Sequence, residues 1–483
     1  MKVLVTDYTL YARRFFIGYL LMCALIVGLL VMAAFFVPGE LRTGEIDSAL
    51  TSGALSVQSI EPGSVVNLPY YLLQRLSFLL FGVSTLSIKL PSIILGALTV
   101  IGIFALTRSW FGRHIAIITT ISAVATAQFL FLIQDGTPFI IFSFITIWLL
   151  AASTFITRVH LFSTFWKVIA CVLMAVALYI PLGIYLVIAL IITASLHPHI
   201  RYVIRRVSRT RLIIAVALGL AAVAPLVYAI VLQPSVALTL LGIPADGLHL
   251  PDSITQAGQT LFGFLSTSDS YLLRPLYSLG LALLICIGAY RLLTVKHTAR
   301  SYTVLILSAF LIPLVLIDPT HATSLFPIAV IMIAMGVSLL IQKWYKLFPR
   351  NPYARIAGLV PISIIVVGLA YTGLMRYMNN YTYSPNILRH YSSDLTLLSD
   401  TIRDVEGKTL LITTESEAPF YRLVAHYDER FTVSNGFDGA VKNMLVTSDR
   451  YASGRPVGML SEIVTNDRAG SADRFYVYKT DTK

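Results

Sequence analysis

Charged residues are scarce in this chain, and acidic residues are scarcest in its first three-quarters. Only 12% of the 483 residues are charged, whereas 57% are hydrophobic. Residues 1–375 contain 10 Asp or Glu, and the shorter remainder contains 14. A single soluble core stops growing at roughly 250–300 residues, so a water-soluble protein would not need so much apolar surface. Apolar runs such as residues 15–37 can cross the hydrocarbon layer. The composition predicts a polytopic membrane protein.

Cysteine is also rare, and its placement excludes two classes of structure. The three cysteines, Cys23, Cys171 and Cys286, all lie inside apolar runs. The exposed segments therefore carry no disulfides, and Cys-based metal sites are excluded by number.

The net charge of +12 comes from residues 1–375, which hold 23 basic residues against 10 acidic ones. This excess marks membrane topology and argues against a nucleic-acid partner.

The apolar runs and the basic residues between them predict the topology. With the N-terminus in the cytoplasm, most basic loop residues fall on the cytoplasmic side, as the positive-inside rule requires. The first run is too long for a signal-peptide core, so we interpret it as a retained helix. An odd number of crossings places the C-terminus outside, and the lack of external cysteines favours a bacterial plasma membrane. The eleven predicted spans are 15–37, 90–107, 115–132, 138–157, 168–180, 182–196, 212–232, 275–290, 302–317, 323–341 and 356–375.

The composition changes near residue 376, which predicts two domains. Residues 1–375 form the membrane domain, with large outer loops at 38–89 and 233–274. The apolar stretch Leu68–Gly82 is too short to span and is typical of a helix lying in the membrane interface. Residues 376–483 are expected to form a small α/β domain outside the membrane. Its predicted elements are a helix at 395–405 and strands at 410–414, 431–434, 444–447 and 475–478.

Three carboxylates, Glu45, Asp47 and Asp135, lie at the mouths of spans on the predicted outer side. Acids beside a bilayer are costly, so each is a candidate functional group. Simpler interpretations stay open. Thr43 could begin a helix whose first-turn acids suit the helix dipole, and Asp135 could occupy a turn before the next helix. Four further groups are the candidate outer cations, which could equally anchor span ends or be polar loop residues: Arg75, Lys89, Arg274 and the titratable His321.

Residues 67–157 carry a characteristic order of motifs. They are NLPYYLL from Asn67, LFGV from Leu80, KLPS from Lys89, LTRSWFGR from Leu106 and IQDGTPF from Ile133. This layout resembles the GT-C superfamily of polyprenyl-phosphate-sugar-dependent glycosyltransferases, in the branch of the protein O-mannosyltransferases and lipid A aminoarabinose transferases. The resemblance covers about the first 160 residues. It implies a GT-C-like fold and transfer of a hexosyl or pentosyl group, with inversion, from a polyprenyl-phosphate-linked sugar to a protein, lipid or glycan acceptor at the outer face.

The chain departs from the family pattern at two places. The family has an adjacent acidic pair after the first span, where this chain has Glu45-Ile-Asp47. Many relatives have arginine in the motif at the end of the third span, where this chain has Thr137. The resemblance implies that Glu45 or Asp47 is the catalytic base, and that Asp135 assists acceptor binding or coordinates a divalent cation such as Mg²⁺ or Mn²⁺.

An acceptor hydroxyl must lose its proton as it attacks, so a carboxylate serves as base. The leaving phosphate needs cations, for which Arg75, Lys89, Arg274 and His321 are the candidates. Two alternatives stay open: a GT-C scaffold that has lost catalysis, and a lipid or solute transporter. The absence of an internal two-fold repeat argues against the transporter.

Overall fold

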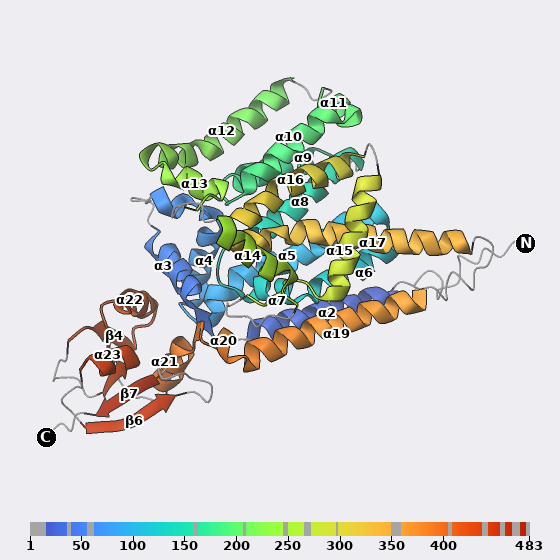
Figure 1. Cartoon of the computed structure of the whole chain (residues 1–483). Coiled ribbons are helices and arrows are strands. Elements are labelled where there is room, and N and C mark those ends of the chain that lie inside the picture. Colours follow the sequence, from blue (N-terminus) through green and yellow to red (C-terminus); the bar gives the residue numbers. More distant parts are fainter. Residues whose placement is uncertain are drawn as a thin grey trace, which may run out of the picture.

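We describe a computed structural model of the whole chain. The residues that it describes are 16–35, 40–55, 62–158, 163–205, 209–244, 250–264, 272–295, 298–348, 359–403, 408–436, 443–454, 459–465 and 474–479. Figure 1 shows a large assembly of helices with a small sheet region at one end, close to the C-terminus. The end of the predicted tail helix, residues 404–405, lies outside the described residues.

The helices of the membrane portion coincide with the predicted apolar runs. Each of the eleven runs overlaps at least one helix. Five of the described helical segments are long and apolar enough to cross a membrane, and the pair α6–α7 makes a sixth if it is one broken span. The mainly helical, multi-pass character is confirmed, but the number eleven is not. The helices are α2 Phe16–Phe35, α5 Thr85–Phe111, α6 Arg113–Val124, α7 Ala127–Gln134, α8 Phe139–Arg158, α9 Ser163–Ala177, α10 Gly183–Leu196, α11 Pro198–Arg205, α12 Arg209–Leu232, α15 Leu279–Thr294, α16 Ala299–Ile317, the 3-10 helix η3 Pro319–Leu325, α17 Phe326–Leu347 and α19 Leu359–Tyr383.

The third predicted span, 115–132, is not straight. It is divided into α6 and α7, which meet at an angle of 68°. Thr126 begins α7, and its hydroxyl accepts a hydrogen bond from the backbone N–H of Phe129 at 3.2 Å. At Gly373, α19 lies so close to this break that a Cβ there would overlap the carbonyl oxygen of Ala125. The bend aims the carboxyl end of α7, and hence Asp135, at the outer elements.

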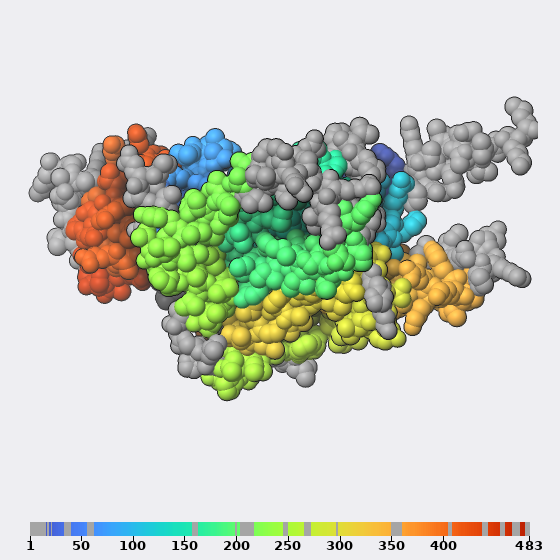
Figure 2. Space-filling model, turned by 90° about the horizontal axis from the view of Figure 1, so that it is seen from above, coloured from blue at the N-terminus to red at the C-terminus, as the bar shows by residue number. Residues whose placement is uncertain are grey.

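Helices α9 to α12 form a layer on one side of the bundle, and this layer is at the top of Figure 1. Both α10 and α12 contact α9. Figure 2 shows this face, which is hollowed between α10 and α12. The two helices therefore do not close over α9 along their whole length.

The two large loops that the sequence predicts on the outer side fold into short elements that position the candidate site. A helix, α4, is present where the interfacial helix is predicted. Its polar side chains face the protein and its apolar side chains face outward, the reverse of a surface helix in a water-soluble protein. Its buried side chains include Gln74 and Ser77, whereas leucines such as Leu76 and Leu79 are more than half exposed. A helix at a lipid surface needs this arrangement because the hydrocarbon accepts the exposed leucines. The outer elements are β1 Leu41–Arg42, α3 Thr43–Ala54, the 3-10 helix η2 Pro62–Val65, α4 Leu68–Phe81, α13 Ser235–Leu241 and α14 Leu250–Phe262.

The tail folds around a five-stranded mixed sheet of order β4-β3-β5-β7-β6. Strand β3 pairs in parallel with β4 and β5, while β7 is antiparallel to β5 and β6. All four predicted strands and the predicted helix are present, but α20, α22, α23, β2 and β6 were not predicted. The domain boundary at residue 376 stays a prediction, because α19 continues to Tyr383. The tail elements are α20 Pro385–Leu388, β2 Tyr391–Ser392, α21 Asp394–Arg403, β3 Thr409–Ile412, α22 Ala418–Tyr427, β4 Phe431–Ser434, β5 Asn443–Thr447, α23 Ser448–Ser453, β6 Met459–Thr465 and β7 Arg474–Lys479.

The sheet region is attached to the outer loops by packing and by a strand pair. Ala49 of α3 and Phe78 of α4 share one buried cluster with residues of α21, α22 and the sheet. Gly53 of α3 faces Leu423 of α22, and a Cβ at Gly53 would clash with that leucine. Strand β1 pairs with β2, with Arg42 opposite Tyr391. The tail therefore holds the segment that carries Glu45 and Asp47.

Two glycines set the spacing of α15 and α17, which leads to a first prediction. A Cβ at Gly288 would overlap the carbonyl oxygen of Met332, and one at Gly336 would press on the backbone of α15. Gly288→Ala should lower the free energy of unfolding by about 1–3 kcal/mol, because backbone cannot give way as a side chain can. Thermal unfolding of the purified protein in detergent measures this.

Gly219→Ala in α12 is the matched control for Gly288→Ala. A Cβ at Gly219 meets nothing within 4 Å, and alanine has the higher helix propensity, so this variant should be as stable as the wild type or slightly more stable. Equal unfolding temperatures for the two variants would contradict the close approach of α15 and α17.

Candidate active site

Arg42 and Asp135 form a buried ion pair between β1 and the end of α7. One guanidinium nitrogen, Nη2, donates to both carboxylate oxygens of Asp135, at 2.9 and 3.0 Å. The side chains are 10% and 2% exposed. Thr137 also donates its hydroxyl to Asp135, and the Arg42 guanidinium lies about 6 Å from the rings of Phe131 and Phe139. The carboxylate of Asp135 is thus held from two sides and shielded from water.

Glu45 is buried within the same region and is fully occupied by hydrogen bonds. Its carboxylate accepts from the backbone N–H of Arg42 at 2.7 Å and from that of Gly136 at 2.5 Å. The first bond is half of a capping box at the start of α3. Burial raises the pKa of Glu45, Lys89 lowers it, and Asp135 raises it. Glu45 lies in the first turn of α3, as the simpler interpretation of this acid predicts.

Lys89 is the third member of this network and lies 2% exposed. Its ammonium is 3.8 Å from Glu45 Oε1, donates to the carbonyl oxygen of Glu40 at 2.6 Å, and donates to Gln134 at 2.9 Å. Burying two charges costs several kcal/mol per ion unless each is paired and hydrogen-bonded. Arg42, Glu45, Lys89 and Asp135, which we call the buried charge cluster, meet that condition.

Gln74 of α4 joins this cluster to the neighbouring helices. Its amide nitrogen donates to the carbonyl oxygens of Ile88 and Gly136, at 2.9 and 3.0 Å. Its amide oxygen accepts from the hydroxyls of Ser48 and Ser52 in α3, at 2.9 and 2.6 Å. One buried side chain therefore ties α3, α4, α5 and the α7–α8 turn together.

Asp47 is arranged differently, because it is the exposed member of the three predicted carboxylates. It lies on α3 next to α4 and acts on Tyr71 of that helix. Burial raises the pKa of Tyr71, a hydrogen bond with the Asn67 side chain lowers it, and the Asp47 carboxylate raises it. Asp47 and Tyr71 are therefore electrostatic neighbours, and both are outside the buried charge cluster.

A pocket of about 320 Å³ begins beside Tyr71. Asn67 and Tyr71 line one side, and Pro181 lies in the turn between α9 and α10. Gln233 lies just before α13, and Ser235, Val236 and Thr239 belong to α13. Backbone hydrogen bonds hold these walls together. The N–H of Asn67 donates to the carbonyl of Tyr179 at 2.7 Å, and the N–H of Leu182 donates to that of Leu240 at 2.9 Å. The polar groups on this wall are amides and hydroxyls, which suit recognition of a hydroxyl-rich ligand.

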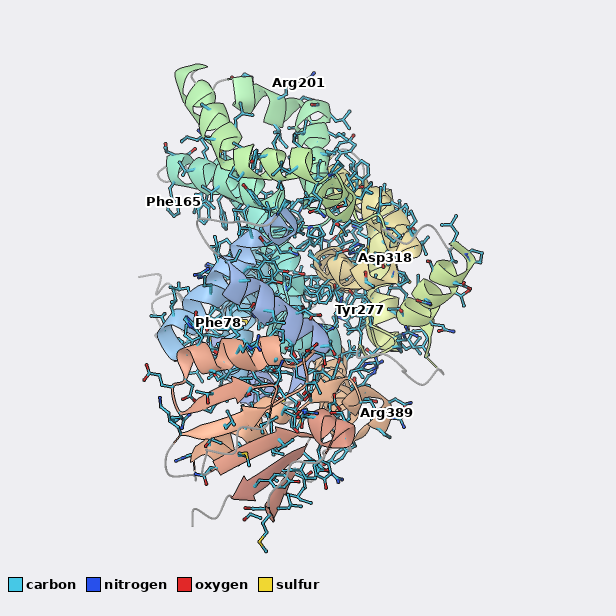
Figure 3. All side chains as sticks on the ribbon, turned by 90° about the vertical axis from the view of Figure 1, so that its left-hand side faces the viewer. Phe78, Phe165, Arg201, Tyr277, Asp318 and Arg389 are labelled. Carbon is cyan, nitrogen blue, oxygen red and sulfur yellow. The ribbon has the colours of Figure 1, made fainter. Side chains whose placement is uncertain are left out.

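The remaining predicted cations are distributed around this region. Arg75 is partly exposed and lies two turns after Asn67 on α4, on the same helix face as Tyr71. Arg274 donates to Gln259 at 3.4 Å. His321 lies 3.6 Å from Asp318 and abuts Gly242, which ends α13. Figure 3 places Asp318 on the face of the bundle beside the tail, across from Phe78 of α4.

The structure also brings in residues that the sequence did not single out. Arg42 was not among the candidate cations, yet it pairs with Asp135 across 93 positions of sequence. Tyr71 and Asn67 were read as part of a motif without a role, and Thr239 was not considered. An aromatic and an amide four positions apart on an interfacial helix could have indicated a shared polar face. For the divalent cation, no group of three or more His, Cys, Asp or Glu side chains suited to a metal occurs among the described residues.

Comparison with solved structures shows that the helices are arranged in the fold of the membrane protein ArnT. The crystal structure of ArnT from Cupriavidus metallidurans bound to undecaprenyl phosphate matches with a TM-score of 0.56 and 13% identity, over 96% of this chain and 98% of that one. The apo ArnT structure matches equally, over 95% and 97%. The apo oligosaccharyltransferase of Archaeoglobus fulgidus has a TM-score of 0.48 and 12% identity, over 91% of this chain and 70% of that one.

Residues 68–228 match the family described as dolichyl-phosphate-mannose-protein mannosyltransferase. This confirms the resemblance to GT-C glycosyltransferases that the motifs of residues 67–157 indicate. No curated protein sequence matches the chain.

Proposed function

We propose that this protein is a membrane glycosyltransferase that moves a sugar from a polyprenyl-phosphate donor to an acceptor at the outer face, with inversion. The fold it shares with ArnT, whose structure holds undecaprenyl phosphate, supports the donor class. The family match over residues 68–228 supports the transfer reaction. The basic residues at the opposite end of the bundle support an orientation with the N-terminus in the cytoplasm and the C-terminus outside.

The observation that carries the site assignment is the contrast between Asp47 and the other two acids. Glu45 and Asp135 are buried and have their oxygens occupied. Asp47 is exposed, and it is an electrostatic neighbour of Tyr71, which lines a pocket with polar groups. A base must reach the proton it removes, so accessibility decides between the candidates. We therefore assign the base to Asp47, and we assign Glu45 and Asp135 to holding the loop that carries it.

In the proposed reaction Asp47 accepts the proton of an acceptor hydroxyl as its oxygen bonds to the anomeric carbon. The bond from that carbon to the phosphate oxygen breaks, and its electron pair leaves with the phosphate. Arg75 lies on the helix face of Asn67 and Tyr71, so it is our first candidate for the developing phosphate charge. Arg274 and His321 are further candidates. Lys89 is occupied within the buried charge cluster, and we assign it to that cluster.

Transfer by the purified protein in proteoliposomes tests this function. The assay supplies a set of polyprenyl-phosphate-linked sugars together with peptide, lipid and glycan acceptors, and a parallel reaction with a chelator tests for a divalent cation. Transfer from at least one donor is expected. If the wild type transfers no sugar but still binds polyprenyl phosphate, the scaffold without catalysis is the better description. If it moves a solute across the vesicle membrane instead, the transporter is.

Filling the pocket gives a second prediction. Thr239 lines the pocket from α13 and is exposed, so tryptophan there adds bulk without entering the core. Thr239→Trp should lower kcat/KM for transfer on the order of 10²-fold, since a reacting group displaced by about 1 Å already loses that much. Initial rates at several acceptor concentrations measure it. Thr255→Trp on the exposed side of α14 is the control, and equal rates for both variants would place the substrate elsewhere.

A further inference from the structure

A groove between α15 and α17 lies away from the proposed active site. It has a volume of about 370 Å³, and its walls are Cys286, Ile287 and Tyr290 from α15 with Leu339, Leu340 and Lys343 from α17. Its lining is almost entirely carbon, apart from one ammonium, one phenol and one thiol. Because apolar surface is costly to leave in water but free in lipid, this composition suits a hydrocarbon chain.

The groove has a fixed shape, since the two helices that form it are locked together. Gly288 lies against the carbonyl oxygen of Met332, and Gly336 lies against that of Leu284. Helices that approach through glycines leave their larger neighbours standing on either side of the contact. Ile287 is such a neighbour, since it is adjacent to Gly288 in α15. Leu339 is another, since it follows Gly336 by three positions in α17.

The charged end of the groove lies at the basic end of the bundle. Lys343 and Lys346 are near the end of α17, and Arg291 is near the end of α15. Arg300 begins α16 and donates to the carbonyl oxygen of Trp110 at 2.7 Å, which places the end of α5 at the same level. None of the four ion pairs between described residues involves Lys343. The ammonium of Lys343 is therefore open to an anion from outside the chain.

We propose that this groove binds one anionic phospholipid, with an acyl chain along Ile287 and Leu339 and its phosphate at Lys343. A phosphodiester with net negative charge complements the lysine, and Tyr290 is of the residue type that lies at the level of lipid headgroups. A zwitterionic lipid offers the same hydrocarbon without the net charge. The site would tie the protein to the anionic leaflet on the side opposite the proposed transfer reaction.

The thiol of Cys286 reports on occupancy, because it lines the groove and is exposed. With Cys23→Ser and Cys171→Ser, it is the remaining cysteine of the three in the chain. Its alkylation by a maleimide is followed in detergent micelles to which phosphatidylglycerol or phosphatidylcholine is added. Phosphatidylglycerol should protect at an about fivefold lower concentration, the effect of one lysine on an anionic headgroup.

With Lys343→Ala, phosphatidylglycerol should protect Cys286 at the same concentration as phosphatidylcholine. With Lys343→Arg, phosphatidylglycerol should still protect at the lower concentration. Lys346→Ala is the control, since Lys346 does not line the groove. Equal protection by the two lipids in the wild type would overturn the proposal, as would a preference that survives Lys343→Ala. Protection that depends on protein concentration and not on lipid would also overturn it, and would identify a second copy of the chain as the occupant.

Discussion

Asp47→Asn should lower the rate constant of sugar transfer by about 10²–10⁴-fold, the range that general base catalysis contributes. Asparagine keeps the size of the side chain but cannot accept the proton of the acceptor hydroxyl. Because Asp47 is exposed at the surface of α3, the variant should unfold at the temperature of the wild type. Single-turnover transfer and thermal unfolding of the same preparation measure the two quantities.

Asp252→Asn is the control for Asp47→Asn, because Asp252 is an exposed acid in the first turn of α14 and outside the pocket. It should transfer sugar at the wild-type rate. Full activity of Asp47→Asn would remove Asp47 as the base. Loss of activity with loss of folding would show that Asp47 serves the structure instead, and the assignment would fail in that case too.

Glu45→Gln, compared with Asp47→Asn, tests whether Glu45 has a structural role and Asp47 a catalytic one. Glu45 accepts two backbone N–H groups beside Lys89. A glutamine must direct its own N–H₂ toward one of these donors and leaves Lys89 with less compensation, so the protein should unfold at lower temperature. Asp47→Asn should lower the transfer rate and leave the unfolding temperature unchanged. Glu45→Gln, in contrast, should lower the unfolding temperature.

Sequence patterns predicted the parts of this protein that depend on local order. Runs of apolar residues predicted the strands from Phe431 and Phe475, and the stretch from Leu68 predicted a helix, because period and composition decide such elements. The bend between α6 and α7 was missed. Its causes are the capping hydroxyl of Thr126 and the close approach of Gly373, and the second of these lies almost 250 residues away.

The candidate site was predicted in its residue types but not in its partners. The sequence predicted Glu45, Asp47 and Asp135 on one side of the membrane, but it did not decide whether Glu45 or Asp47 is the base. Their burial separates them, and burial arises from contacts such as that of Arg42 with Asp135, 93 positions apart. Gly136 is a further example, since a side chain there would press on Ile88 and on Glu45. No local pattern encodes such a contact.

Asp135→Leu should lower the free energy of unfolding by about 3–5 kcal/mol, the cost of leaving the other half of a buried ion pair without its partner. Arg42 would keep its charge at a site where 10% of its side chain is exposed, and Thr137 would lose its acceptor. Denaturant unfolding in detergent measures the change. The control is Asp428→Ala, which removes an ion pair with Arg430 on the tail domain, where the side chains are 26% and 56% exposed. A solvent-exposed pair contributes about 0–1 kcal/mol, so this variant should unfold almost as the wild type does.

Adding Arg42→Met to Asp135→Leu should recover most of the lost stability, because two apolar side chains of similar volume can replace a buried pair at little cost. The rings of Phe131 and Phe139, near the guanidinium in the wild type, would then face a thioether. If Asp135→Leu costs no more than Asp428→Ala, the pair does not hold the loop. If the double variant is no more stable than the single one, the loss comes from Thr137 and the turn. A recovered double variant that still transfers sugar would show that Asp135 has no part in the chemistry.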